Sequence, residues 1–202
     1  MKKTIPRNTV YRLSLYHHCL ERSKGGSISS EELAKLAGVK PPQLRKDLAW
    51  CGSLGKRGTG YDIPTLQKSL TETLGISGLQ PVVLVGAGRM GSALLRFRES
   101  FSRRGFEIAA AFDTRPAKRS RIEAVPLFPM TSLARFVNER SVRLAILCVP
   151  GVVAQDVCNA LVACGIQAIL NFAPIVLQTP EQIAVNNVNL AIELENLSYF
   201  LK

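Results

Sequence analysis

The stretch 81–113 constrains the fold of this chain more than any other part of the sequence. A short apolar run of strand type, Pro81–Val85, leads directly into a glycine-rich segment, Gly86–Gly91. The residues that follow have apolar side chains at helical spacing, and a second apolar run, Phe106–Phe112, ends at Asp113. This order of strand, glycine turn, helix and strand predicts an α/β domain.

Three glycines in this turn have the spacing of a dinucleotide site. Gly86 would make the tight turn, Gly88 would let the backbone approach a pyrophosphate, and Gly91 would let the helix lie close to the strand. The pyrophosphate would bind at the helix N-terminus, because unpaired N–H groups and the helix dipole attract anions there. Asp113 follows Gly91 by 22 residues and would accept hydrogen bonds from a ribose diol. The alternative is a glycine-rich turn that binds nothing.

Further strand and helix signals extend the sheet. Strands are expected at Val142–Val149 and Gln167–Asn171, with a helix over Val152–Cys164 between them and a basic loop at Arg115–Arg121. Strands that alternate with helices predict a doubly wound parallel sheet of Rossmann type, whose ligands bind at the carboxyl ends of the strands. The strand ends that would face such a ligand are Gly86, Asp113, Val149, Pro150 and Asn171.

The first 80 residues predict a helix-turn-helix. The first helix is expected over Thr9–Glu21, and its apolar stripe consists of Val10, Leu13, Tyr16, His17 and Leu20. A capping box formed by Ser29 and Glu32 begins a short second helix, which Gly38 ends. Prolines at the first turn begin a third helix, Pro41–Trp50. Two helices joined by a turn that contains glycine are typical of a DNA-binding motif.

The third helix has a buried and an exposed face. Leu44 and Leu48 can face the core, and Asp47 is expected to be an internal partner for neighbouring cations. The N-terminal half of this helix, where the motif contacts bases and phosphates, carries Gln43, Arg45 and Lys46. Gly52–Tyr61 is punctuated by glycines with Lys56 and Arg57 at its centre, which predicts a two-stranded wing that reaches the DNA backbone or minor groove.

Charge is distributed unevenly along the chain. Lys and Arg outnumber Asp and Glu by 13 to 6 in residues 1–80 and by 12 to 5 in residues 81–143, whereas residues 144–202 carry 1 against 4. Because cations gain free energy by releasing counterions from phosphates, the basic part predicts a polyanion partner. A basic surface that serves only solubility is the alternative.

The sequence divides into three expected parts. A linker helix over Ile63–Gly78 places the boundary of the first domain at residue 80, and a Rossmann-type domain is expected over residues 81–187. The last part, 188–202, contains a helix expected over Ala191–Leu201, which follows a short strand expected over Val185–Leu190. That helix is apolar nearly all round, which indicates burial in a partner subunit, with packing within one chain as the alternative.

Composition limits the class of protein. With 202 residues and 47% apolar residues the chain can form a globular core. It has no apolar run of 18 residues and no signal-peptide pattern at its start, so a cytoplasmic protein is expected. The five cysteines are scattered without a CxxC pair, so we expect neither a disulfide framework nor a zinc site; a reactive redox thiol is the alternative.

Groups that catalyse hydride transfer are missing from the second half of the chain. A dehydrogenase needs an acid or base beside the nicotinamide, yet both histidines, His17 and His18, lie near the N-terminus. Residues 144–201 contain no Lys, Arg or His. The sequence therefore favours a protein that binds and senses a dinucleotide, and we expect no catalytic residues, no metal site and no enzyme activity.

Several runs in this order resemble the Rex family of bacterial redox-sensing transcriptional repressors. They are Gln43–Leu48, Gly58–Tyr61, Gly86–Gly91, Ala111–Asp113, Val149–Pro150 with Ala154–Gln155, and Asn171–Pro174. The resemblance covers nearly the whole chain. It implies a homodimer with an N-terminal winged helix, a Rossmann domain that binds NADH or NAD⁺, and a C-terminal helix swapped onto the other subunit. It also implies a repressor that binds palindromic double-stranded operator DNA, that NADH releases, and that has no membrane partner.

The resemblance also assigns roles by position. Implied DNA contacts are Arg12, Gln43, Arg45, Lys46, Lys56, Arg57 and Gly58. Implied NAD(H) contacts are Gly86, Ala87, Gly88, Arg89, Met90 and Gly91 for the pyrophosphate, Asp113, Thr114 and Arg115 for the adenine ribose, and Val149, Pro150, Asn171 and Pro174 for the nicotinamide end. An arginine such as Arg115 can accommodate a 2′-phosphate, although Asp113 should repel one.

Three positions depart from the family pattern. His18 and Asn189 stand where an Arg and an Asp are frequent, a pair thought to couple nucleotide state to the winged helices, and Phe97 stands near a usual Tyr. One alternative is therefore a DNA-binding regulator whose nucleotide response is lost or retuned. Another is a non-regulatory NAD-binding or CoA-binding protein, although an acyl-CoA ligase would need a histidine that the C-terminal part lacks.

Overall fold

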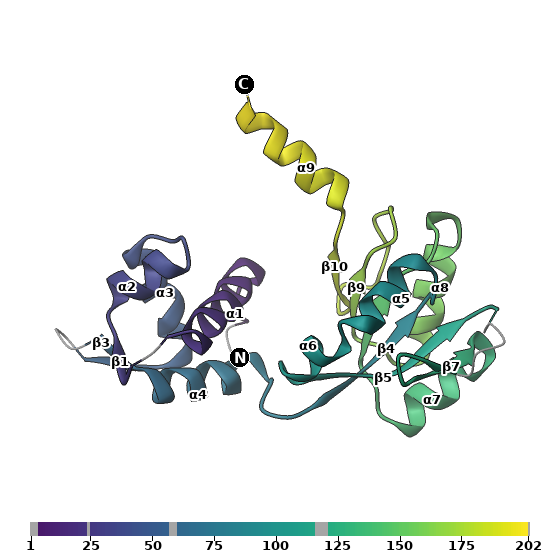
Figure 1. Ribbon diagram of the computed structural model, residues 1–202, viewed down its shortest axis with the longest axis horizontal. Helices are drawn as coiled ribbons and strands as arrows, with labels where there is room; N and C mark the ends of the chain where they lie inside the picture. The colour runs from purple at the N-terminus through teal and green to yellow at the C-terminus, as the bar shows by residue number, and fades with distance from the viewer. Residues whose placement is uncertain (1–3, 24, 57–59, 116–120, 202) are drawn as a thin grey trace. The chain divides into compact units, whose positions relative to one another are not determined.

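The chain folds into two compact units, 1–78 and 79–202, and each is described by itself. The computed structural model describes residues 4–23, 25–56, 60–115 and 121–201 (Figure 1). The sequence had placed the first boundary at residue 80. No helix within the described ranges is both long and apolar enough to cross a membrane.

The N-terminal unit contains four α-helices and a small antiparallel sheet among its described residues. The helices are α1 (Arg7–Glu21), α2 (Ser30–Leu36), α3 (Pro41–Leu48) and α4 (Ile63–Leu74), with a 3-10 turn, η1 (Ala49–Cys51), after α3. The strands are β1 (Ser27–Ile28), β2 (Gly55–Lys56) and β3 (Gly60–Asp62), in the order β1-β3-β2. Helix-turn-helix and wing are therefore both present, as the sequence predicted.

Local sequence accounts for where these helices begin and end. The Ser29 hydroxyl accepts a hydrogen bond from the Glu32 N–H, and the Glu32 carboxylate accepts one from the Ser29 N–H, so the predicted capping box begins α2. Prolines begin α3. The backbone N–H groups of a helix's first turn have no partner within the helix, and proline has no N–H that would need one. Gly75, at φ +70°, ends α4.

The structure corrects the expectations for three helices of this unit. Helix α1 begins at Arg7, and its buried residues are Thr9, Leu13, Tyr16 and Leu20, while Val10 is exposed. Helix α3 ends at Leu48, before Trp50. Helix α4 is no linker, because Leu66 and Leu70 are fully buried in the same core as α1 and α3; its four-residue leucine spacing reflects packing within this unit.

The C-terminal unit is built on one twisted sheet with helices on both faces (Figure 1). Its strands are β4 (Gln80–Val85), β5 (Phe106–Asp113), β6 (Arg121–Ile122), β7 (Val125–Pro129), β8 (Leu144–Leu147), β9 (Ala168–Asn171) and β10 (Ala184–Asn187). Their order is β10-β9-β8-β4-β5-β7-β6, and all neighbours are parallel except β6 with β7. This order of the six parallel strands is that of a dinucleotide-binding Rossmann fold, so the predicted fold class is confirmed.

Four α-helices among the described residues connect the strands of this sheet. They are α5 (Arg89–Arg96), α6 (Arg98–Ser102), α7 (Leu133–Glu139) and α8 (Gly151–Ala163), with the 3-10 turn η2 (Met130–Ser132); α9 (Leu190–Ser198) and η3 (Tyr199–Leu201) end the described chain. Residues 122–141, where no helix or strand was predicted, contain β7 and α7. The strand expected over Val185–Leu190 is β10, which ends at Asn187.

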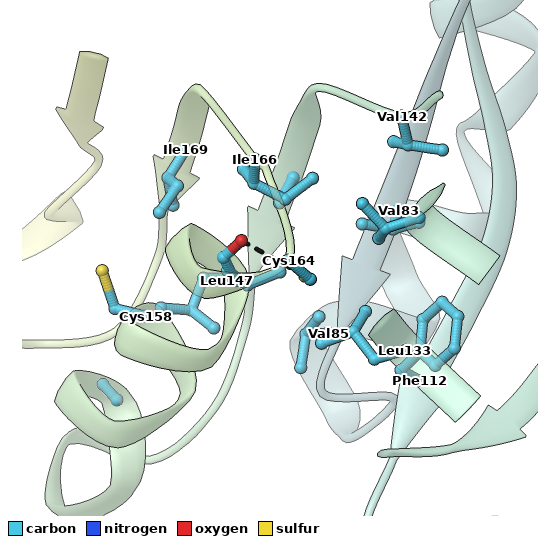
Figure 2. Close-up of a cluster of buried hydrophobic side chains, with 14 of the residues drawn as sticks. Val83, Val85, Phe112, Leu133, Val142, Leu147, Cys158, Cys164, Ile166 and Ile169 are labelled. Carbon is cyan, nitrogen blue, oxygen red and sulfur yellow. Dashed lines mark hydrogen bonds between the residues drawn. The ribbon is translucent and has the colours of Figure 1, made fainter. Parts of the chain in front are cut away.

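Alternate residues of each central strand enter different cores. Val83 and Val85 of β4 pack with Phe112, Leu133 and Leu147 on the side of α7 and α8 (Figure 2). Val82 and Leu84 belong to the other core, which includes Leu95 of α5. Burial on both faces explains why the strands of this parallel sheet are continuous apolar runs.

Candidate nucleotide site and nucleic-acid interface

The glycine turn lies where the sheet changes winding direction. It follows β4, whose neighbours β5 and β8 lie on either side. The Gly86 N–H donates to the carbonyl of Phe112 at 2.8 Å, and the Cys148 N–H donates to the carbonyl of Val85 at 2.7 Å. The carboxyl ends of three strands therefore meet at this point, which is where open α/β sheets bind their ligands.

Glycine is required at each of the three positions of this turn for a different physical reason. Gly86 has φ +96°, and a Cβ there would clash with the carbonyl of Cys148. A Cβ on Gly91 would clash with the carbonyl of Gly86, so helix α5 can approach the turn only with glycine at this position. A Cβ on Gly88 would meet no atom within 4 Å. Gly88 is the N-cap of α5 and leaves open space there, as the approach of a pyrophosphate requires.

Asp113 lies beside this turn at the end of β5. One carboxylate oxygen accepts a hydrogen bond from the Ala87 N–H at 2.9 Å, and the other accepts one from the Arg115 N–H at 2.9 Å. These bonds fix the carboxylate next to the glycine turn while the residue stays partly exposed. Thr114 and Arg115 are exposed beyond it, and Arg89 and Met90 are exposed at the start of α5.

Two segments form the opposite end of the candidate nucleotide site. A Cβ on Gly151 would lie 3.1 Å from the Ile175 side chain and 3.5 Å from the ring of Pro174, so the start of α8 lies against the segment after β9. Val149 is partly buried, whereas Pro150 and Pro174 are exposed. These three residues can border a ligand.

Asn171 is enclosed by the protein. Its side-chain N–H groups donate to the Ile175 carbonyl at 2.9 Å and to the Asn187 amide oxygen at 2.8 Å, and its own oxygen accepts from the Ala173 N–H at 2.9 Å. With 0% of its surface exposed, Asn171 holds the segment after β9 in place and does not present its amide to a ligand.

Among the described side chains of the N-terminal unit, the most buried charged one is Asp47 of α3, which is bound to α1. Asp47 is 1% exposed and accepts hydrogen bonds from Arg12 Nε at 2.6 Å, Tyr16 Oη at 2.8 Å and Gln43 Nε2 at 2.9 Å. A weaker bond comes from Thr9 at 3.3 Å. The expected role of Asp47 as an internal partner is confirmed.

This Asp47 network changes how two expected DNA contacts are understood. The side chains of Arg12 and Gln43 are bound to Asp47 inside the unit, so they orient α3 in this structure. Burial opposes ionisation of Asp47, but the hydrogen bonds from Arg12, Tyr16 and Gln43 outweigh it and lower its pKa. Tyr16, which was predicted only as part of the apolar stripe of the first helix, is also a hydrogen-bond donor, and burial and its bond to Asp47 raise its pKa.

The exposed face of α3 is where Arg45 and Lys46 lie. Both side chains are on the face opposite the buried Leu44 and Leu48. Lys56 lies in β2 of the wing, and Arg57 and Gly58 lie outside the described residues. Gly60 lets β3 of the wing lie close to β1. Its φ is +79°, and a Cβ at this position would clash with the carbonyl of Ile28 in β1.

All five thiols are at least partly buried, Cys158 and Cys164 fully. Burial raises the pKa of Cys19, Cys51, Cys148, Cys158 and Cys164, and for Cys148 it raises the pKa to about 12. Since the thiolate is the reactive form, we expect iodoacetamide at pH 7.5 to label the folded protein at least roughly tenfold more slowly than free cysteine. Rapid labelling of one cysteine, followed by loss of DNA binding after peroxide treatment, would instead indicate a thiol-based sensor.

Within the described ranges, no group of three or more His, Cys, Asp or Glu side chains is placed to hold a metal ion.

Comparison with known proteins adds independent information on both units. A family model described as "CoA binding domain" matches residues 79–175, and one described as "Putative DNA-binding protein N-terminus" matches residues 4–49. The chain is 43% identical over 201 residues to the redox-sensing transcriptional repressor Rex of Desulforamulus reducens, covering 98% of this chain and 95% of that relative. It is 41% identical over 200 residues to Rex of Streptomyces coelicolor, covering 96% of this chain and 77% of that relative.

Solved structures of one Rex-family repressor, RSP, resemble the whole chain. RSP in complex with β-NAD⁺ and operator DNA aligns with a TM-score of 0.90 at 33% identity, covering 99% of this chain and 94% of RSP. RSP in complex with β-NADH aligns with a TM-score of 0.84 at 32% identity, covering 99% of this chain and 95% of RSP. Relatives of this identity over nearly the full length confirm the resemblance found in the sequence, and the protein belongs to the Rex family of redox-sensing transcriptional repressors.

Proposed function

We propose that this protein is a transcriptional repressor that reports the ratio of NADH to NAD⁺. The N-terminal unit would bind palindromic operator DNA through α3 and the wing, and the C-terminal unit would bind NAD(H) at the glycine turn. NADH would release the operator. The protein would act in the cytoplasm as a regulator, with no enzyme activity.

One observation carries this proposal: the chain has both a helix-turn-helix and a dinucleotide fold, and aligns over 99% of its length with a repressor solved with β-NAD⁺ and operator DNA. The geometry of each unit agrees with it. The space around Gly88, at the N-terminus of α5, is open, and the exposed cations Arg45 and Lys46 lie on the outer face of α3. The implied contacts at Ala87, Arg89, Met90, Thr114, Val149, Pro150 and Pro174 form part of the proposal.

The position of Asp113 favours NAD(H) over its 2′-phosphorylated form. Its carboxylate is fixed beside the glycine turn by two backbone N–H groups, at the place where an adenine ribose would lie. A carboxylate there would accept hydrogen bonds from the ribose diol and repel a phosphate.

We further propose that the functional unit is a homodimer formed through α9. No residue of α9 is buried, although Leu190, Ile192, Leu194 and Leu197 are large and apolar. The N-terminal unit offers a groove of 860 Å³, whose lining includes the apolar Leu15 and Leu36, the cationic Arg22 and Lys35, and one acidic residue, Glu32. Glu193 and Glu195 of α9 from a second chain would complement these cations.

A double substitution in α9 tests the dimer. The double variant Leu194→Glu, Leu197→Glu should lose about 3–6 kcal/mol of the free energy gained by burying the two leucines of each helix. At micromolar protein concentration it should therefore be a monomer. Asn196→Glu with Ser198→Glu adds the same charge at polar positions and should leave the dimer intact. Size-exclusion chromatography with light scattering reads the mass directly, and a Leu194/Leu197 variant that stays dimeric would exclude α9 as the interface.

The physical basis of release is a difference in binding between two dimer arrangements. NADH and NAD⁺ differ in charge and ring shape, so each can favour a different arrangement of the two winged helices. A palindrome is read only when both recognition helices are about 34 Å apart or a multiple of it. A coupling of roughly 1–3 kcal/mol would change operator occupancy about five- to a hundredfold.

A second candidate is a repressor that binds DNA regardless of nucleotide. The Asn189 amide oxygen accepts from the Ala191 N–H at 3.0 Å as the N-cap of α9, and His18 lies 3.2 Å from a carboxylate oxygen of Glu21. Both side chains, at the positions that depart from the family pattern, are therefore used locally. This second candidate predicts tight operator binding that neither nucleotide alters.

Fluorescence anisotropy on a palindromic duplex, selected by the wild-type protein from a randomised pool, distinguishes the two candidates. Titration at fixed salt with NADH should release the duplex while NAD⁺ should not. Lys46→Ala should abolish binding to the duplex, whereas Lys68→Ala on α4, which removes the same charge, should change it little. Equal binding with both nucleotides would favour the second candidate, and no duplex selected at all would contradict both.

A further inference from the structure

Arg45, an exposed side chain of α3, is held by the first turn of α2. Its Nη1 atom donates to the Ser30 hydroxyl at 3.0 Å and lies 3.3 Å from Glu31 Oε1. The Arg45 side chain stays 50% exposed and that of Glu31 69% exposed, so this pair lies at the surface of the helix-turn-helix. Among the described residues, no acidic side chain pairs in this way with the neighbouring Lys46.

The acceptors of Arg45 are themselves fixed. The capping box between Ser29 and Glu32 orders the first turn of α2, where Ser30 and Glu31 lie. The Ser30 hydroxyl lies 3.1–3.2 Å from both Glu31 carboxylate oxygens. A bond to its own backbone N–H, then the Ser30 bond and the charge of Arg45, hold the pKa of Glu31 below its ordinary value. Glu31 is therefore an anion at neutral pH.

The pair leaves part of the guanidinium free. Arginine has five N–H donors in a rigid fork, and the hydrogen bonds of Arg45 to Ser30 and Glu31 use Nη1 alone. The Nε and Nη2 edge has no acceptor in the described part of the chain. An arginine reads guanine through two parallel donors, so an arginine fixed at one nitrogen presents its other edge with less rotamer entropy to lose.

We propose that Glu31, with Ser30, is a positioning residue that holds Arg45 ready to read one base pair of the operator. The inference rests on the proposed function, because it requires α3 to be the element that reads DNA. An acid next to a polyanion would be unfavourable for phosphate binding alone, so its contribution should concern discrimination between bases and not general affinity.

The test compares the operator with all single base-pair variants of one half-site. Glu31→Gln should lower the preference for one base pair by about two- to tenfold, the range expected for ordering one long side chain. Binding to a scrambled duplex should be unchanged or slightly tighter. Arg45→Ala should relax the preference at the same base pair, and in the Arg45→Ala background Glu31→Gln should have no further effect. Ser30→Ala should act in the same direction as Glu31→Gln.

Glu72→Gln on α4 is the matched control, since it makes the same change of charge away from α3 and should leave base preference intact. The inference is overturned if Arg45→Ala relaxes one base pair while Glu31→Gln and Ser30→Ala leave every preference unchanged. It is also overturned if Glu31→Gln changes operator and scrambled duplex by the same factor. The proposed function itself fails, separately, if Arg45→Ala and Lys46→Ala both leave operator binding at the wild-type level.

Discussion

Asp47→Ala is expected to abolish operator binding and to lower the free energy of unfolding of the N-terminal unit by about 3–5 kcal/mol. The carboxylate is buried and accepts hydrogen bonds from four side chains on α1 and α3. Its removal would leave the Arg12 charge without its partner and the Tyr16 hydroxyl without an acceptor. Thermal unfolding followed by circular dichroism, together with anisotropy on the selected duplex, measures both effects.

Two comparisons separate positioning from general stability. Tyr16→Phe removes one hydrogen bond to a charged group and should cost about 1.5–3 kcal/mol while retaining operator binding at low temperature. Asp62→Ala removes an exposed carboxylate that caps α4 and should cost only about 1 kcal/mol. An Asp47→Ala protein as stable as wild type would show that the Asp47 network does not hold α3.

The same carboxylate gives stability a defined dependence on pH. Because the pKa of Asp47 is lower in the folded state, its contribution is present above the ordinary aspartate pKa of ~3.9 and is lost as the pH falls through the folded value. Between pH 5 and 8 this group should therefore add no slope. Wild type should lose its advantage over Asp47→Asn only below about pH 4.

Gly88→Val is expected to weaken NADH binding by at least roughly a hundredfold, about 2.7 kcal/mol, without unfolding the protein. The side chain would meet no protein atom near Cβ and would instead fill the space at the N-cap of α5 where the pyrophosphate is expected. The variant should then repress at any NADH concentration. Fluorescence titration of NADH and thermal unfolding measure binding and stability side by side.

Other glycines provide the controls for Gly88→Val. Gly91→Val should destabilise the C-terminal unit, because its Cβ would clash with the carbonyl of Gly86. Gly78→Val lies in open space away from the turn and should leave NADH binding unchanged. If Gly88→Val binds NADH as wild type does, the glycine turn is not the nucleotide site.

Features set by neighbours in the sequence were predictable, while features set by distant contacts were not. The glycine turn and the capping box follow from residues within six positions of one another. Arg12 lies 35 residues from Asp47, so its spacing on α1 could not indicate that the guanidinium faces inward. Gln43 lies one helical turn before Asp47 in α3. The Gln43 amide faces inward because it donates to the Asp47 carboxylate, which is buried, and that burial was not visible in the sequence.

The missed elements have a similar explanation. Pro126 and Pro129 interrupt the apolar pattern of β7, and α7 has only seven residues. What stabilises them is tertiary packing: the rings of Phe128 and Phe136 lie 5.9 and 5.6 Å from that of Phe112 in β5. Asn171 was expected at the ligand because it ends a strand, and its burial depends on contacts with Ile175 and Asn187.

Reciprocal coupling between the two ligands tests the central claim most directly. The affinity of NADH should be measured by titration with and without the operator duplex, and that of the duplex with and without NADH, at one salt concentration. Since binding free energies are linked, both affinities should fall by the same factor, about five- to a hundredfold. An NADH affinity that is unchanged by saturating operator would show that the nucleotide does not control DNA binding in this protein.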